Sequence, residues 1–119
     1  QNVEHLREAR QVFEAGVVTL ATQRASSSCI AKLKEKLEHM RRSKGDRTEF
    51  VKADQSFHTT IAEISGNPIF LAVSQAMFKW LSESHRDYHR NLVGVPELED
   101  LTLKEHEAIF ERIINKDPN

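Results

Sequence analysis

Residues 50–68 read FVKADQSFHTTIAEISGNP and show a clear helical pattern. Their apolar side chains recur every three or four residues, which places them on one face of an α-helix: Phe50, Ala53, Phe57, Ile61 and Ile64. Thr48 is the expected N-cap of this helix and Gly66 its expected end. Asn67 followed by Pro68 then predicts the start of the next helix, because the first helical residue leaves its N–H unpaired and proline has none to lose.

The same spacing extends in both directions and predicts four more helices. One helix spans about residues 2–24, and another follows the serine run 26–28, whose hydroxyl groups can cap its N-terminus. The helix that starts at Pro68 is apolar as far as Leu81, and a last helix follows Pro96. No stretch of four or more residues alternates apolar and polar side chains, so we predict an all-α fold, an antiparallel bundle of five helices.

Length and charge exclude several classes of protein. The 119 residues fit a single domain, and 39% hydrophobic with 29% charged residues is typical of a soluble globular protein. Seventeen basic against eighteen acidic side chains give a formal charge of −1, without the basic excess that binding to DNA phosphates requires. No uncharged run reaches the ~20 apolar residues of a membrane span. We therefore expect a soluble, cytoplasmic domain that neither enters a membrane nor binds DNA by itself.

Asp54 and His58 are the most informative polar pair. Their i, i+4 spacing puts both side chains on one helix face, and Ile61 continues that row, so the pair should point towards the bundle interior. His106 shares a row with Ile109 in the last helix and should also face inward. Two histidines and a carboxylate from different helices can bind a divalent transition metal. The spacing alone also allows a hydrogen-bonded surface pair, and the glutamates on either side of His106 allow a solvated histidine.

Other reactive side chains give weaker signals. Cys29 is the only cysteine, so it can form neither an internal disulfide nor a CxxC site, and we expect it to be buried. His85 and His89 repeat the i, i+4 spacing within a charged run, which predicts exposure at the surface. Trp80 is expected in the core or at an interface.

The residues around Asp54 resemble a known family. Residues 54–58 (DQSFH) and 65–68 (SGNP) resemble the D-x-x-F-H…(S/G)-G-N-P motif of the FadR-type C-terminal ligand-binding (FCD) domain. That domain is the sensor half of GntR-family transcription regulators. Arg10 followed by Glu14 resembles the R-x-x-x-E signature of its first helix, and residues 105–109 (EHEAI) resemble its E-H-x-x-I segment. The resemblance spans essentially the whole chain and implies a helical bundle.

The resemblance also implies a metal site. In the metal-binding branch of the family, the matching positions make Asp54, His58 and His106 ligands of a divalent transition metal such as Zn, Ni or Mn. A further histidine lies on a final helix, which this sequence lacks beyond Asp117. The family's N-terminal winged-helix DNA-binding domain is also missing, so the chain resembles a family member truncated at both ends. Residues 1–119 would then form one effector-binding sensor domain.

The resemblance assigns Arg10 to the effector. It would bind the carboxylate of a small molecule, such as a hydroxy acid or a sugar acid, although an internal ion pair with Glu14 or Glu63 is an equally open alternative. The implied protein is a transcription regulator and not an enzyme, and it would contact DNA only through the absent N-terminal domain. Loss of the final helix would expose apolar surface on the bundle, so we also expect a homodimer.

Two other functions remain open from the sequence. A metal-dependent hydrolase could use the same three ligands with a bound water. It would lack an obvious general base, because Glu107 is adjacent to His106 and neighbouring helical residues point about 100° apart. The chain could also be a purely structural dimerisation module in which the polar cluster is incidental.

Overall fold

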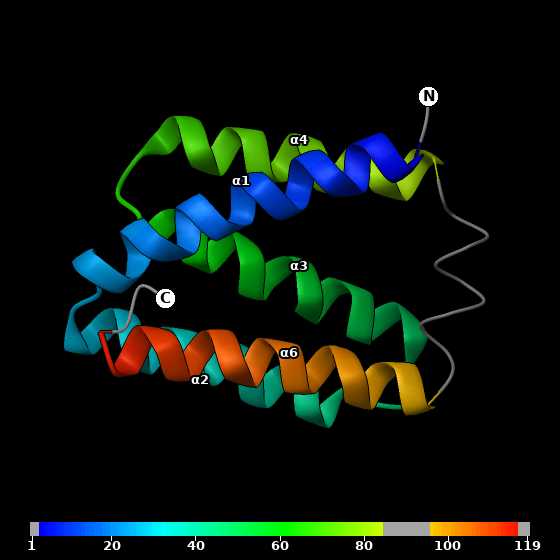
Figure 1. Cartoon of the computed structure of the whole chain (residues 1–119). Helices are drawn as coiled ribbons and strands as arrows, with labels where there is room; N and C mark the ends of the chain where they lie inside the picture. The colour runs from blue at the N-terminus through cyan, green and yellow to red at the C-terminus, as the bar shows by residue number, and fades with distance from the viewer. Residues whose placement is uncertain (1–2, 85–95, 117–119) are drawn as a thin grey trace.

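The computed structural model describes residues 3–84 and 96–116, which form a bundle of five helices (Figure 1). The helices are α1 (Val3–Arg24), α2 (Ser27–Arg42), α3 (Arg47–Ile64), α4 (Pro68–Ser84) and α6 (Pro96–Ile114). These residues contain no strand, which confirms the predicted all-α fold. Within the same two ranges, no helix is both long and apolar enough to span a membrane. His85 and His89 lie outside the described residues.

The predicted caps of α2 and α4 are confirmed. Ser26 accepts a hydrogen bond from the backbone N–H of Cys29 at 3.3 Å, which satisfies a donor in the first turn of α2. Asn67 accepts one from the N–H of Ile69 at 2.9 Å at the start of α4. Between α3 and α4 the chain reverses through Gly66, whose φ of 77° is a conformation that glycine adopts without a steric penalty.

The start of α3 differs from the prediction. Asp46, and not Thr48, is the N-cap, and its carboxylate accepts a hydrogen bond from the N–H of Glu49 at 3.2 Å. Thr48 lies inside the first turn. Asp46 and Glu49 have the spacing of a capping box, and an aspartate at the N-cap is also stabilised by the positive end of the helix dipole. The pattern of apolar residues did not show this earlier start.

Helix α3 lies at the centre of the bundle and packs against α1, α2 and α4, while α6 packs against α1 and α2 (Figure 1). All five apolar residues predicted for its inner face are buried: Phe50, Ala53, Phe57, Ile61 and Ile64. Complete burial of Phe57 contributes roughly 1.5–3 kcal/mol to stability. It also fixes the rotation of α3 about its axis, and that rotation directs Asp54 and His58 towards α6.

Cys29 is only partly buried, so the prediction of a core cysteine was wrong. The residue lies in the first turn of α2, where its Sγ is 3.2 Å from the hydroxyl of Ser26. It packs against the edge of the core instead of within it. Its position beside the helix cap determines its exposure more than its residue type does.

Candidate metal centre

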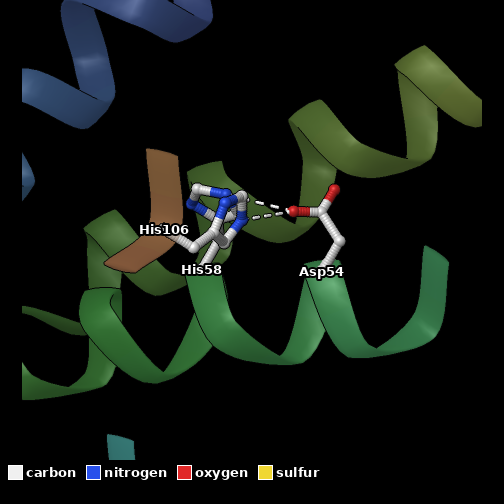
Figure 2. Close-up of side chains that lie close together, drawn as sticks. All are labelled: Asp54, His58 and His106. Carbon is white, nitrogen blue, oxygen red and sulfur yellow. Dashed lines mark hydrogen bonds and ion pairs between the residues drawn. The ribbon is translucent and has the colours of Figure 1, made fainter. Parts of the chain in front are cut away.

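Three predicted ligands, Asp54 and His58 from α3 and His106 from α6, lie together in the bundle (Figure 2). One ligand atom from each lies within 4.8 Å of the others. The Nε2 atom of His106 is 2.6 Å from Oδ1 of Asp54, and the Nε2 atom of His58 is 3.3 Å from the same oxygen. Both imidazole rings therefore direct Nε2 at one carboxylate oxygen.

The cluster is inside the protein and is walled by aromatic rings. His58 and His106 are both buried, which excludes the solvated His106 that its glutamate neighbours allowed. The ring of Phe57 is 4.7 Å from that of His106, and the ring of Phe78, from α4, is 5.5 Å from that of His58. These apolar rings lower the polarity on their side of the cluster and so strengthen the electrostatic interactions among its polar atoms.

The second nitrogen of each imidazole is engaged on the side away from the cluster. Nδ1 of His106 donates a hydrogen bond to the carbonyl of Thr102 at 2.7 Å, and Nδ1 of His58 lies 2.8 Å from the carboxylate of Glu14. Metal-binding histidines are held in this way, by a hydrogen bond from the nitrogen that does not bind the ion. Nε2 of His58 is buried and makes no hydrogen bond, because its approach to Asp54 is poorly aligned.

The donor set fits a divalent transition metal. Two imidazole nitrogens and one carboxylate oxygen suit Zn, Ni or Mn. Ligand atoms that share an ion with bonds of about 2.0–2.2 Å lie roughly 3–3.5 Å from one another. The 3.3 Å between His58 and Asp54 falls in that range, whereas the 2.6 Å contact of His106 would have to open slightly.

For both Asp54 and His58, burial shifts the pKa in one direction and the neighbouring charged groups shift it in the other. Burial favours the neutral acid of Asp54, but the hydrogen bond from His106, the close contact with His58 and the charges of both histidines outweigh it and hold the Asp54 pKa well below its usual value. Burial lowers the pKa of His58, yet Asp54 and Glu14 together raise it to about 9. In the metal-free protein, His58 is therefore protonated at neutral pH, and its Nε2 proton lies on the side that faces Asp54, where a cation would bind.

Arg10 forms the internal ion pair that the sequence left open. Its Nε lies 3.0 Å from Oε1 of Glu14, and its guanidinium group sits 4.7 Å above the ring centre of Phe78. The alternative partner, Glu63, is paired with Lys32 at 3.1 Å. The structure thus places Arg10 beside the three clustered residues, linked to them through Glu14.

Glu14 and Phe78 are parts of the site that we did not identify from the sequence. Burial raises the pKa of Glu14, but the hydrogen bond and charge of His58, together with Arg10, outweigh this effect and lower it. The R-x-x-x-E spacing pointed to Glu14 as a partner of Arg10 only. Its contact with His58 depends on how α1 packs against α3, which no local pattern reports.

A cavity of about 620 Å³ lies between α1 and α6 and reaches His58 and His106. Arg7, Arg10 and Arg112 line it. The volume lies within the usual range for a small-molecule site, and the arginines favour an anionic ligand. A second hollow of about 590 Å³ between α3 and α4 has two lysines in its lining but none of the three clustered residues.

Comparison with known proteins identifies the family. The FCD domain model matches residues 5–119. The HTH-type transcriptional repressor NanR of Klebsiella aerogenes is 33% identical over 124 residues, and NanR of Cronobacter sakazakii is 30% identical over 122 residues. Each alignment covers 98% of this chain but 44% of the relative, so the chain spans less than half the length of these curated relatives. No solved structure matches the chain. The chain belongs to the FCD domain family of GntR-type transcription regulators, as its motifs predict.

Proposed function

We propose that this chain is the effector-sensing domain of a cytoplasmic transcription regulator and that it binds a small carboxylate through a divalent metal ion and Arg10. One observation carries the proposal. Asp54, His58 and His106 converge in one cluster, and the two histidines line a cavity that is also lined by arginine side chains. A hydroxy acid or a sugar acid has the oxygen atoms that such a site would recognise.

Each group in the site would have a distinct role in binding the effector. A bound Zn, Ni or Mn ion would supply a Lewis acid for the oxygen atoms of the effector. Asp54 balances only one of its two positive charges, so the centre remains attractive to anions. Arg10 donates charge-assisted hydrogen bonds to the carboxylate, and the ring of Phe78 supports its guanidinium group from below.

The position of the cavity supports a regulatory role. Its lining comes from α1, α3 and α6, so a ligand that contacts all three helices would stabilise one arrangement of the bundle over others. In a homodimeric regulator, that shift would change the spacing of DNA-binding domains that lie outside these residues. The relatives are named repressors, which is consistent with such a change.

Two carboxylates that could serve a hydrolase as general base, those of Glu107 and Glu14, are already engaged by other side chains. A hydrolase with these ligands would need a general base near the metal-bound water. The carboxylate of Glu107 instead accepts hydrogen bonds from Arg41 of α2 at 2.8 and 3.2 Å, on the side of α6 away from the cavity. Glu14 is engaged by both His58 and Arg10. Turnover of carboxylate esters or amides by the metal-loaded chain would contradict this proposal.

A thermal-shift screen tests the proposed function. Small carboxylic acids, and the amide of each acid, are added to the protein with Zn²⁺ or Ni²⁺ and again with a chelator. A ligand that binds only the folded state raises the Tm in proportion to the logarithm of its concentration. We expect at least one acid to raise the Tm only with the metal present and its amide to have little effect. Equal shifts for acid and amide, or shifts that survive the chelator, would contradict the proposal.

A further inference from the structure

Glu14 joins the arginine to the metal centre through its two carboxylate oxygens. Oε1 lies 3.0 Å from Nε of Arg10, and Oε2 lies 2.8 Å from Nδ1 of His58. Glu14 belongs to α1, whereas the three clustered residues belong to α3 and α6. It is not one of the residues whose ligand atoms converge, and it faces His58 on the opposite edge of the imidazole from Nε2.

We propose that Glu14 is a positioning residue for the metal centre and that it acts through His58. This inference rests on the proposed function. By accepting the Nδ1 hydrogen of His58, Glu14 fixes the tautomer that leaves the lone pair of Nε2 free to bind a metal. It also fixes the rotation of the ring, so that Nε2 stays directed towards Asp54 and His106.

The two histidines differ in how they are held. His106 donates its Nδ1 hydrogen to the carbonyl of Thr102 in its own helix, so its orientation is a property of α6 alone. His58 depends on a side chain from a different helix. The metal centre is therefore complete only when α1 is packed against α3, and movement of α1 would release one ligand.

The contacts of Glu14 also predict that Arg10 is not needed for metal binding. Arg10 pairs with Oε1 and His58 with Oε2, so removal of the arginine leaves the contact with His58 in place. Removing a positive charge near a cation site should not weaken binding of a metal. Glu14 and Arg10 are neighbours in an ion pair, yet they should have different effects on metal affinity.

Calorimetric titration with Ni²⁺ or Zn²⁺ alone separates these roles. We expect Glu14→Gln to weaken metal binding about 10–100-fold, the usual effect of losing the partner that orients a ligand. Arg10→Gln should not weaken it. Glu8→Gln is the matched control, because Glu8 lies exposed on the same helix and the charge change is identical. Equal affinities for folded Glu14→Gln and Glu8→Gln would overturn the proposal.

Nuclear magnetic resonance of the Zn²⁺-loaded wild-type protein gives an independent test that no folding defect can confuse. The imidazole of His58 should bind zinc through Nε2 and keep on Nδ1 a strongly deshielded hydrogen, as expected for a hydrogen bond to the carboxylate of Glu14. Zinc on Nδ1 of His58, or no hydrogen-bonded Nδ1 hydrogen, would overturn the role of Glu14 alone. Wild-type protein that binds no metal would instead refute the proposed function.

Discussion

The Nε2 atom of His106 lies 2.6 Å from Oδ1 of Asp54, although 52 positions separate the two residues in the chain. This contact joins α6 to α3, and the ring of Phe57 packs against that of His106, whereas the Asp54 side chain is only partly buried. A buried contact between groups of opposite charge contributes to stability only when all of its polar atoms are satisfied. The contact connects α3 and α6. Together with His58, the two residues also form the place where a cation would fit.

Replacement of Asp54 should affect both stability and metal binding. Asp54→Ala leaves two imidazoles without their shared acceptor, and we expect the free energy of unfolding to fall by about 1–3 kcal/mol in the metal-free protein. The cost stays modest because histidine can lose its proton. Asp100→Ala is the control, since Asp100 is half exposed and should change stability by less than about 0.5 kcal/mol. Urea unfolding of both variants measures the difference, and equal values would contradict the role of Asp54.

The raised pKa of His58 predicts how stability depends on pH. A pKa of about 9 in the folded protein exceeds the ordinary value of 6.5, so the protonated form stabilises the fold. That contribution is complete below about pH 6.5 and is lost as the pH rises towards 9. Melting curves recorded with a chelator should show a falling Tm across this window in the wild type and a flatter profile in His58→Gln. A Tm that rises across the window would contradict the expectation.

Metal binding should have the opposite pH dependence. The ion and the proton compete for Nε2 of His58, so each binding event releases a proton at neutral pH. We expect the affinity for Zn²⁺ to increase between pH 6.5 and pH 8. Calorimetry in buffers of different ionisation enthalpy counts the released protons, and a count of zero would show that His58 does not give up a proton to the metal.

Arg10→Ala should weaken the binding of any carboxylate found in the thermal-shift screen. The loss should be about 2–5 kcal/mol, which is typical for truncating one member of a desolvated charge pair. The arginine contributes through two or more hydrogen bonds of fixed geometry, so lysine should restore only part of the affinity. Arg42→Ala, at an exposed arginine of α2, is the control. Equal affinities of the two variants would exclude Arg10 as a recognition element.

Exposed apolar side chains predict self-association of the bundle. Val12 and Ile69 are 72% and 67% exposed, and Trp80 and Leu101 are about half exposed. They lie on α1, α4 and α6, and association with a second copy of the domain can cover apolar side chains that remain exposed. We expect sedimentation to show a dimer, and Ile69→Lys to shift the equilibrium towards monomer. A wild-type protein that sediments as a monomer at high concentration would contradict this prediction.

Local sequence patterns were sufficient to predict the helices but not to predict every residue of the site. Asp54 and His58 could be paired from their spacing because a helix places i and i+4 side by side. The partnership with His106 needed both its inward row and the family motif, since no local rule relates residues 52 positions apart. The contact between Glu14 and His58 depends on the packing of α1 against α3 and was missed. Thr48 was wrongly expected to be the N-cap of α3 because the apolar pattern does not mark the position of a cap.

The central claim is that Asp54, His58 and His106 together bind one divalent ion. Anomalous X-ray diffraction at the zinc absorption edge, from crystals of the Zn²⁺-loaded protein, tests it most directly. We predict one anomalous peak bonded to Oδ1 of Asp54 and to Nε2 of both histidines, at about 2.0–2.2 Å from each atom. A peak elsewhere, or hydrogen bonds among the three side chains unchanged at saturating zinc, would contradict the claim.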